Sequence, residues 1–260
     1  LISGAVLLLF AYLSDKEKFF AFLKDKSSYI SLILFAFLGL LLTQLTYLIA
    51  IAETNAGTAT VLQYVCPVGV LAYTCIKDRV GPTVSEIASM LLAIGGTFLI
   101  ATHGQLNQLA ITPKGLGWGL FSAFAYALYI ILPLNLIKKW GSMPVIWVGM
   151  LLPGILMVPF SGLVSFQGHY SSDNLLALFG LIVLGTIFAY TVFLKGTSMV
   201  GAVKGSLLAS IEPISAVFFA YMIMNDQFYA IDFIGMGMIL LAVLLISLKD
   251  LIIQKEKGIL

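Results

Sequence analysis

A single carboxylate inside a long apolar segment is the first residue that could do chemistry. Glu212 follows Lys204 by eight residues, which is about 12 Å along a helix that rises about 1.5 Å per residue. If the segment crosses a membrane, this carboxylate lies near the middle of the bilayer, where an ionised group is costly and usually faces a cavity or a partner. We therefore expect Glu212 to bind a proton or a substrate. A neutral, hydrogen-bonded structural glutamic acid is the alternative.

Two prolines, Pro67 and Pro213, interrupt apolar segments at matching places. A proline has no N–H and disrupts the helical bond to the carbonyl four residues earlier, which here belongs to Gln63 or to Ala209. In hydrocarbon these carbonyls need water, a neighbouring side chain or a substrate. The two prolines are therefore candidate hinges for gating, and packing kinks satisfied by adjacent helices are the alternative.

Polar and aromatic side chains within the apolar segments are the candidates for substrate binding. Lying at similar depth in both halves of the chain, they could line one central cavity, although a single tyrosine is more often a packed residue with one hydrogen bond. No metal or organic cofactor is expected, because Cys66 and Cys75 lack metal-type spacing. His103 and His169 fall in polar loops, where we expect them to be solvated. The candidate binding residues are Glu212, Gln44, Gln63, Tyr64, Trp118, Tyr126, Tyr190 and Ser210.

Composition indicates what positions these side chains. Hydrophobic residues make up 60% of the 260 residues, charged residues make up 10%, and the mean hydropathy is +1.06, which is typical of a polytopic membrane protein. Membrane strands are excluded, because the apolar runs lack alternation and exceed the roughly 9–11 residues of such a strand. The sequence therefore predicts an all-α integral membrane protein with apolar segments at 1–13, 29–52, 56–76, 83–102, 115–137, 144–164, 174–194, 203–224 and 230–248.

The basic residues predict the orientation of these segments. When the connections are assigned alternately to the two sides, Lys114 is the one basic residue of 14 that does not share a side with the others. Basic residues gather on the cytoplasmic side, so we expect a multi-pass protein of the cell membrane with a cytoplasmic C-terminus. The lipid bilayer is therefore a partner, and nucleic acid is not expected, because the net charge is only +2 and the basic residues are scattered. Glu53, Glu86 and Asp232 lie near segment ends, and we expect them at the membrane interface.

An internal repeat relates the two halves of the chain. A shift of 146 residues, without a gap, places Pro67 on Pro213 and Glu86 on Asp232, and it also aligns the segment boundaries. Equivalent connections then fall on opposite sides of the membrane, so we expect the halves to be inverted with respect to each other. Substrate sites of inverted-repeat transporters lie near the bilayer midplane, close to interrupted helices.

The repeats are expected at 1–102 and at 115–250, and the first of them is shortened at its N-terminal side. The segment 115–137 has no counterpart, because its match would precede residue 1. We therefore expect a ten-helix inverted-repeat transporter, five helices plus five, whose first helix is absent from this chain. The missing part would comprise about 30 residues, enough for one spanning helix and a connection.

The proline-containing segments resemble those of a known family. Residues 59–68 read Ala-Thr-Val-Leu-Gln-Tyr-Val-Cys-Pro-Val, and residues 205–214 read Gly-Ser-Leu-Leu-Ala-Ser-Ile-Glu-Pro-Ile. Each is followed by an apolar run, a short polar turn and a final spanning segment. The whole chain thus resembles EamA-type transporters of the drug/metabolite transporter superfamily. The resemblance implies a ten-helix fold and secondary transport of small metabolites, commonly export, and it identifies no substrate.

The expected function is secondary active transport of small metabolites such as amino acids or drugs, with export as the expected direction and proton coupling as one option. Desolvation raises the proton affinity of a carboxylic acid and hydration lowers it, so Glu212 could exchange protons as access alternates. The first alternative is an integral membrane enzyme acting on lipid or an isoprenoid carrier, but one arginine and two isolated histidines make no catalytic cluster. A passive facilitator or a sensor is the second alternative, and no oligomeric state is indicated.

Single cysteines test the predicted orientation. In a chain whose two native cysteines are replaced by alanine, Asn107→Cys and Ser172→Cys should react with a membrane-impermeant maleimide in intact cells. Glu256→Cys should react only after the cells are permeabilised, because the basic connections stay in the cytoplasm. Labelling of Glu256→Cys alone in intact cells would establish the opposite orientation.

Overall fold

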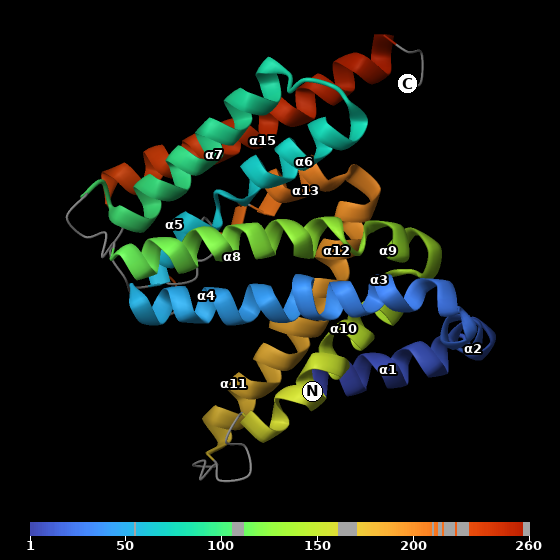
Figure 1. The fold of residues 1–260 in the computed structure, drawn as a ribbon. Coiled ribbons are helices and arrows are strands. Elements are labelled where there is room, and N and C mark those ends of the chain that lie inside the picture. The colour runs from blue at the N-terminus through green and yellow to red at the C-terminus, as the bar shows by residue number, and fades with distance from the viewer. Residues whose placement is uncertain are drawn as a thin grey trace. The chain divides into compact units, whose positions relative to one another are not determined.

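The computed structural model of the chain is helical (Figure 1). It describes residues 1–54, 56–105, 112–160, 171–209, 211–212, 215, 222 and 229–256, and no strand occurs within these ranges. Each apolar segment expected from the sequence coincides at least in part with a helix, and the later parts of 144–164 and of 203–224 fall largely outside the described residues. The prediction of an all-α protein is confirmed for the described residues.

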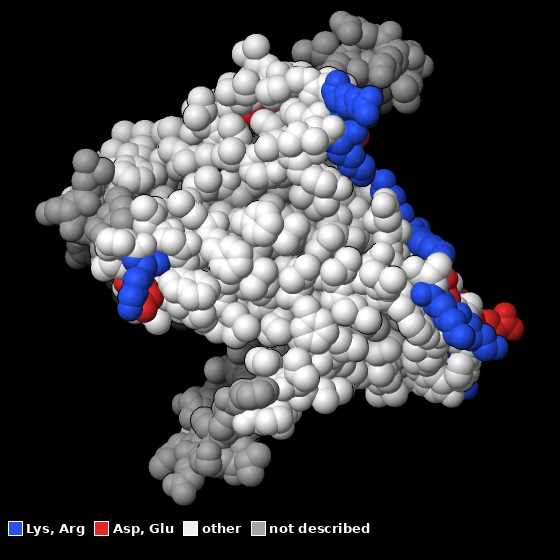
Figure 2. All heavy atoms as spheres, in the orientation of Figure 1, with Lys and Arg blue, Asp and Glu red and all other residues white. Residues whose placement is uncertain are grey.

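Four helical stretches of the described chain are long and apolar enough to cross a membrane. A hydrocarbon core of about 30 Å needs about 20 apolar helical residues. On the face shown in Figure 2, lysine and arginine side chains form a few groups, and the broad surface between them carries almost no charge. These are the features of a multi-pass membrane protein. The long stretches are Lys26–Glu53, Ala59–Asp78, Pro113–Trp140 and Leu175–Val200, and the shorter apolar helices are Ile2–Ser14, Val84–Leu99, Ser142–Met157 and Ala230–Ala242.

The chain packs as two units, and each unit combines segments from both halves of the sequence. The first unit contains Leu1–Thr43 and Leu128–Gly201, and the second contains Gln44–Ala127 and Ala202–Leu260. The expected repeats, 1–102 and 115–250, stay a prediction, and each packing unit combines helices from both of them.

Within the first unit, α1 and α10 lie antiparallel and in close contact. A Cβ atom at Gly4 would lie 2.8 Å from Leu151, and one at Gly154 would lie 2.9 Å from Leu1. Small residues thus allow the two backbones to approach, as is common between membrane helices. The elements of this unit are α1 (Ile2–Ser14), α2 (Lys16–Lys24), η1 (Lys26–Ser28), α3 (Tyr29–Leu34), η2 (Phe35–Leu41), α9 (Leu134–Trp140), α10 (Ser142–Met157), η4 (Val158–Phe160), α11 (Ser172–Ile182), η6 (Val183–Phe188) and α12 (Ala189–Val200).

Within the second unit, α7 and α15 lie side by side and antiparallel (Figure 1). A Cβ atom at Gly96 would lie 2.5 Å from the carbonyl oxygen of Gly235, and one at Gly95 would lie 2.8 Å from the methyl group of Met238. Glycine therefore sets the distance between these helices. The elements are α4 (Leu42–Glu53), α5 (Ala56–Gln63), α6 (Cys66–Asp78), α7 (Val84–Thr102), α8 (Pro113–Ile131), α13 (Ala202–Ala209) and α15 (Ala230–Glu256), of which α4 begins and α8 ends within the first unit.

Carboxylates cap α7 and α15 in the same manner. Oε2 of Glu86 accepts hydrogen bonds from the backbone N–H of Thr83 at 2.8 Å and from its hydroxyl at 2.7 Å. Oδ2 of Asp232 accepts a hydrogen bond from the backbone N–H of Tyr229 at 2.9 Å. A carboxylate that reaches back three residues in this way satisfies a donor at the start of a helix. Glu86 and Asp232 are equivalent under the shift of 146 residues, so the sequence repeat also repeats the chemistry of a helix start.

Asp232 also joins the start of α15 to the end of α7. Its carboxylate is fully buried, and Oδ1 lies 2.8 Å from Nδ1 of His103, which follows α7 directly and has a φ of 49°. The His103 ring lies 4.7 Å from the ring of Tyr229, measured between centroids. His103 keeps 34% of its side chain exposed but has a carboxylate partner that the sequence did not indicate. Asp232, expected at the membrane interface, is buried within protein, because the antiparallel pairing brings these helix ends together. His169 lies outside the described residues.

The helix boundaries repeat in the register found in the sequence. The shift of 146 residues carries α5 onto α13 without an offset and α4 onto α12 with an offset of one residue. It also carries η2 onto η6 to within two residues, and both of these elements are π-helices. Single π-helical turns are rare and frequently occur at functional sites. Their equivalence indicates that the two halves share unusual local structure as well as composition.

Gly96→Ala should destabilise the second unit. The new Cβ would lie 2.5 Å from a backbone carbonyl that cannot rotate away, so α7 and α15 would have to separate. Overpacking of this kind typically costs about 1–3 kcal/mol. Gly237→Ala in α15 is the control, since nothing lies within 4 Å of its Cβ and alanine favours a helix over glycine. Thermal unfolding in mild detergent should show a lower midpoint for Gly96→Ala alone, and equal midpoints would contradict the close packing.

Candidate functional site

Tyr64 and Glu212 form a polar centre in the second unit. The Tyr64 hydroxyl donates to Oε2 of Glu212 at 2.7 Å, and it lies 2.9 Å from the carbonyl oxygen of Ala209. The Tyr64 side chain is 3% exposed, whereas the Glu212 side chain is exposed. The structure thus brings two of the predicted site residues into direct contact, although 148 positions separate them in the sequence.

The chain leaves its helix at Tyr64, close to Pro67. Helix α5 ends at Gln63, and α6 begins at Cys66. Pro67 is buried in the first turn of α6, where a missing N–H removes no helical hydrogen bond. The interruption therefore falls before the proline, and it places the Tyr64 ring between two helices. A gating role for Pro67 stays a prediction, and Pro213 lies outside the described residues.

The Ala209 carbonyl is the second acceptor that the Tyr64 hydroxyl meets. It belongs to the last residue of α13, and it is one of the two carbonyls that the sequence predicts to lose a helical donor to a proline. The Tyr64 hydroxyl lies within hydrogen-bond distance of it. A buried polar group without a partner costs about 1–3 kcal/mol, and lipid offers no replacement. Tyr64 therefore stabilises a backbone acceptor that belongs to a distant segment.

One hydroxyl proton serves two acceptors here, which makes the centre sensitive to protonation. When Glu212 is ionised, the Tyr64 hydroxyl has a single proton to share between the carboxylate and the Ala209 carbonyl. When Glu212 is protonated, it can donate to the Tyr64 oxygen, and Tyr64 can then donate to Ala209, so that all three groups are satisfied. Uptake of a proton thus changes which hydrogen bonds hold Tyr64 to α13.

Two further predicted residues lie beside this centre. Tyr126 of α8 is half-buried and is close enough to Tyr64 for an electrostatic interaction. Gln63 is half-buried and directly precedes Tyr64. Cys66, for which the sequence indicated only packing, is fully buried and is close enough to Glu212 for an electrostatic interaction. A carboxylate, two phenols and an amide are therefore available in one region of the second unit.

Three other predicted residues are not shown at this centre. Trp118 of α8 is half-buried, and its ring centroid lies 6.1 Å from that of Phe121. The side chain of Gln44 is exposed on α4, and Ser210 lies outside the described residues. Within the described residues, no group of three or more His, Cys, Asp or Glu side chains has the arrangement of a metal site.

Tyr190 belongs to an aromatic cluster in the first unit. The ring of the buried Tyr129 lies 5.7 Å from that of Tyr190, 6.1 Å from that of Phe35 and 6.2 Å from that of Phe193, measured between centroids. Phe35 begins the π-helix η2, and Tyr190 follows the π-helix η6 by two residues. Rings from η2 and from α12 thus lie close to that of Tyr129. The idea that Tyr190 and Gln44 share one cavity stays a prediction.

Sequence reasoning missed a charged cluster around Asp25 in the first unit. Its Oδ2 lies 2.6 Å from Nζ of Lys139, 2.5 Å from the Ser28 hydroxyl and 3.1 Å from Nε1 of Trp140. The hydrogen bond from Lys139, followed by those from neighbouring serines, holds the pKa of the Asp25 carboxyl well below its usual range. Because 114 positions separate Asp25 from Lys139, no local pattern in the sequence indicates this pair.

Comparison with known proteins places the chain among transporters. It matches the EamA-like transporter family over residues 1–102 and 113–248. It is 35% identical over 250 residues to the "Uncharacterized inner membrane transporter YicL" of Salmonella typhimurium, covering 96% of this chain and 83% of that protein. It is 23% identical over 202 residues to the "Uncharacterized transporter YcbK" of Bacillus subtilis, covering 75% of this chain and 65% of that protein.

A solved crystal structure also has a similar fold. Its TM-score to this chain is 0.76 at 12% sequence identity, and the superposition covers 95% of this chain and 84% of that one. At this identity the likeness concerns the fold alone. The family match over most of the residues and the similarity to the Salmonella transporter carry the assignment: the chain belongs to the EamA-like transporter family.

Proposed function

We propose that this membrane transporter is a secondary active exporter of small metabolites, driven by protons, in which Glu212 carries the proton or contacts the substrate. The observation that carries the proposal is the hydrogen bond between Tyr64 and Glu212 at the interruption between α5 and α6. An ionisable side chain in so apolar a segment costs free energy, and such residues usually bind a proton, an ion or a substrate. The relatives are named as transporters, and no enzymatic step forms part of the proposal.

Proton uptake supplies a mechanism for coupling. The two protonation states of Glu212 leave different hydrogen bonds at Tyr64 and at the Ala209 carbonyl, so they favour different arrangements of α13 relative to the α5–α6 interruption. A ligand or a proton shifts a conformational equilibrium only when it binds the two states unequally. Glu212 meets this condition, because its proton has a partner oxygen on Tyr64 in one arrangement and loses it when the two segments separate.

The repeated architecture supports alternating access. Helices α5 and α13 occupy equivalent places in the two halves; Tyr64 directly follows α5, and Glu212 lies three residues after the end of α13. In the proposed inverted arrangement the basic connections stay in the cytoplasm, the C-terminus is cytoplasmic, and the chain lies in the cell membrane. The phenols and amide beside Glu212 suit a small substrate with both polar and apolar parts, such as an amino acid or a drug.

Conservative changes at Glu212 test the coupling. In liposomes with an imposed pH gradient, and with radiolabelled amino acids, nucleosides and drugs as substrates, Glu212→Gln should insert normally but lose the dependence of flux on the gradient. Glu212→Asp should keep part of that dependence, because it keeps an ionisable group. Glu53→Gln is the control, since Glu53 is an exposed glutamate in the same unit.

A structural role predicts the reverse order, because glutamine can replace a neutral hydrogen-bonded acid, whereas the shorter aspartate misplaces the contact. Flux is normalised to the amount of inserted protein. Infrared difference spectra taken across a pH titration give a readout without any substrate, since the carboxyl band of Glu212 should vanish in Glu212→Gln. Wild-type gradient dependence in Glu212→Gln would sink the proposal.

Tyr64→Phe should reduce gradient-driven flux by about tenfold or more while leaving the ring packing intact. The hydroxyl donates to a carboxylate, and hydrogen bonds to charged groups contribute about 1.5–3 kcal/mol, of which about 1.4 kcal/mol corresponds to tenfold in an equilibrium. Tyr73→Phe in α6 removes a hydroxyl from an exposed ring and serves as the control. Equal flux in the two variants would show that the Tyr64 hydroxyl takes no part in transport.

A further inference from the structure

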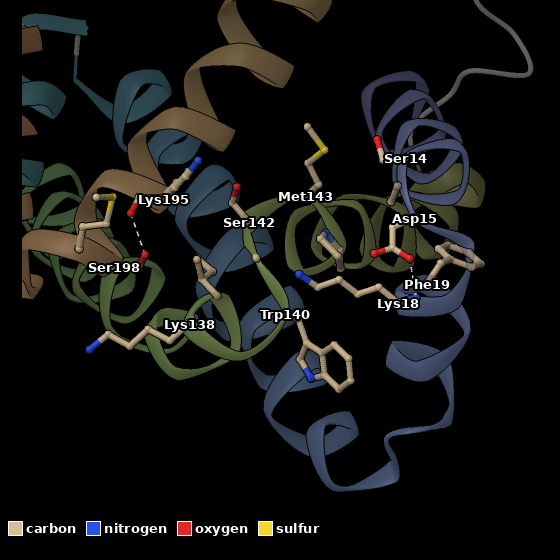
Figure 3. Close-up of a pocket in the computed structure, with 15 residues that line it drawn as sticks. Ser14, Asp15, Lys18, Phe19, Lys138, Trp140, Ser142, Met143, Lys195 and Ser198 are labelled. Carbon is tan, nitrogen blue, oxygen red and sulfur yellow. Dashed lines mark hydrogen bonds between the residues drawn. The ribbon is translucent and has the colours of Figure 1, made fainter.

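A second polar region lies in the first unit, and neither the proposed function nor the family assignment uses it. It is a pocket of about 540 Å³ formed by the end of α1, the start of α2, the connection from α9 to α10 and the last turns of α12. Figure 3 shows its side chains, which come from three parts of the sequence. The polar and charged lining residues on which the argument rests are Ser14, Asp15, Lys18, Ser142, Lys195 and Ser198.

The pocket carries positive charge that its own residues do not neutralise. Lys18, Lys138 and Lys195 line it together with one carboxylate, Asp15. That carboxylate already caps α2, since Oδ1 accepts the backbone N–H of Lys18 at 2.9 Å. Within the part of the chain that the structure describes, none of the three lysines forms an ion pair. An anion entering the pocket would therefore find unused cationic donors.

Lys139, in the same unit, differs from the pocket lysines because a carboxylate neutralises its charge. Lys139 lies 2.6 Å from Asp25 and is held in an ion pair. Lys18 and Lys195, by contrast, are exposed and line the pocket from α2 and α12. In Figure 3 the Lys18 side chain extends into the pocket toward Ser142, whereas Lys138 points to its margin. Lys18 and Lys195 are therefore the cations that an occupant would contact.

The backbone adds to this positive field. Helix α10 begins at Ser142, directly after Gly141, whose φ of 87° favours glycine and allows the sharp turn from α9. The unpaired N–H groups and the dipole at a helix start favour an anion. Ser142 and Met143, the first two residues of this 16-residue helix, both line the pocket. Two lysines and a helix start thus line the same pocket from separate elements.

The arrangement of the donors, the volume of the pocket and its apolar lining indicate which type of anion it would bind. Donors that approach from several directions suit a tetrahedral oxyanion, which presents acceptor oxygens on all sides, better than a planar carboxylate. A volume of about 540 Å³ falls in the range of small-molecule sites and leaves room for an organic group. Phe19, Trp140, Met143 and Met199 supply an apolar surface for such a group.

The location agrees with a ligand that carries a phosphate. In the sequence-based orientation, the connections that hold Lys18 and Lys138 and the end of the stretch that holds Lys195 lie on the cytoplasmic side. The pocket then lies where spanning helices end, at the depth of lipid headgroups. Basic pockets between helices on this side are suited to anionic headgroups, and soluble phosphorylated metabolites are present in the same compartment.

We infer that this pocket is an anion site that binds a phosphate group attached to a small organic moiety. Lys18 and Lys195 bind the phosphate oxygens from opposite walls, the first N–H groups of α10 add hydrogen bonds, and the apolar wall holds the organic part. The phosphate belongs either to the headgroup of an anionic lipid of the inner leaflet or to a soluble phosphorylated metabolite. The site does not depend on Glu212, so its test is independent of transport.

Binding to the purified full chain tests the inference. Native mass spectrometry and the fluorescence of the tryptophans report binding of short-chain phosphatidylglycerol, short-chain phosphatidylcholine, glycerol 3-phosphate and inorganic phosphate. Replacing both lysines, in Lys18→Gln/Lys195→Gln, should weaken binding of the phosphate probe about tenfold or more, as expected when each surface lysine contributes about fivefold. Lys16→Gln/Lys24→Gln is the control with the same change of charge, since neither residue lines the pocket.

The probes distinguish the two sources of phosphate. Lysine-dependent binding of phosphatidylglycerol that the soluble phosphates do not displace assigns the site to a lipid headgroup. Lysine-dependent binding of glycerol 3-phosphate or inorganic phosphate assigns it to a soluble ligand. Both outcomes support an anion site. Equal weakening in the two double variants would overturn it, and so would failure of every phosphate probe to bind more tightly than phosphatidylcholine.

A charge-conserving variant covers the case in which the glutamine variant fails to fold. Lys18→Arg/Lys195→Arg keeps both cations and should bind within about threefold of the unchanged chain, because arginine also binds phosphate. Size-exclusion profiles establish that each variant is intact. Loss of binding in a well-folded arginine variant would contradict a site built on these two cations.

Discussion

Hydrocarbon cannot satisfy a backbone polar group, and the described structure follows from that constraint. Continuous helices satisfy their N–H and C=O groups internally. At the last described residue of α13, the Tyr64 hydroxyl lies within hydrogen-bond distance of the Ala209 carbonyl. Where a helix begins, a carboxylate takes over, as Glu86 and Asp232 do for α7 and α15. Side chains thus satisfy backbone groups at these positions, and Glu86 and Asp232 occupy equivalent places in the two halves of the chain.

This constraint also explains why a carboxylate can be kept in the second unit. Glu212 is held by a phenol whose second neighbour is a backbone carbonyl, so the same proton network that satisfies the interrupted helix responds to the charge of the carboxylate. Helix packing around the network is set by backbone contact, because Gly96 lets α7 approach the Gly235 carbonyl.

Charged residues in the first unit fall into two classes. Lys139 pairs with Asp25 and lowers the pKa of its carboxyl, so the pair ties the end of α2 to α9. Lys18 and Lys195 face a pocket that holds one carboxylate, itself engaged at a helix start. The contrast separates cations that stabilise the fold from cations that are available to a ligand.

Local patterns in the sequence determined a large part of this protein. Apolar runs predict the helices, the register of 146 residues predicts the equivalence of α5 with α13, and Pro67 predicts an interrupted helix near Tyr64. Tyr64 and Glu212 were both recognisable as unusual residues for an apolar segment. These features are local, because periodicity, proline chemistry and the cost of a buried charge each depend on a few neighbouring residues.

Only the tertiary structure decided which residues meet. Tyr64 contacts Glu212, His103 contacts Asp232, and Lys139 contacts Asp25 across separations of 148, 129 and 114 positions. It also gathered the lysines of one pocket from three segments and placed Tyr190 with Tyr129, in the unit that does not contain Tyr64. The physical reason is that contacts between helices depend on how closely the backbones approach and at which level they cross. Many weak packing contacts spread over distant glycines and side chains set that geometry, and no short stretch of sequence contains it.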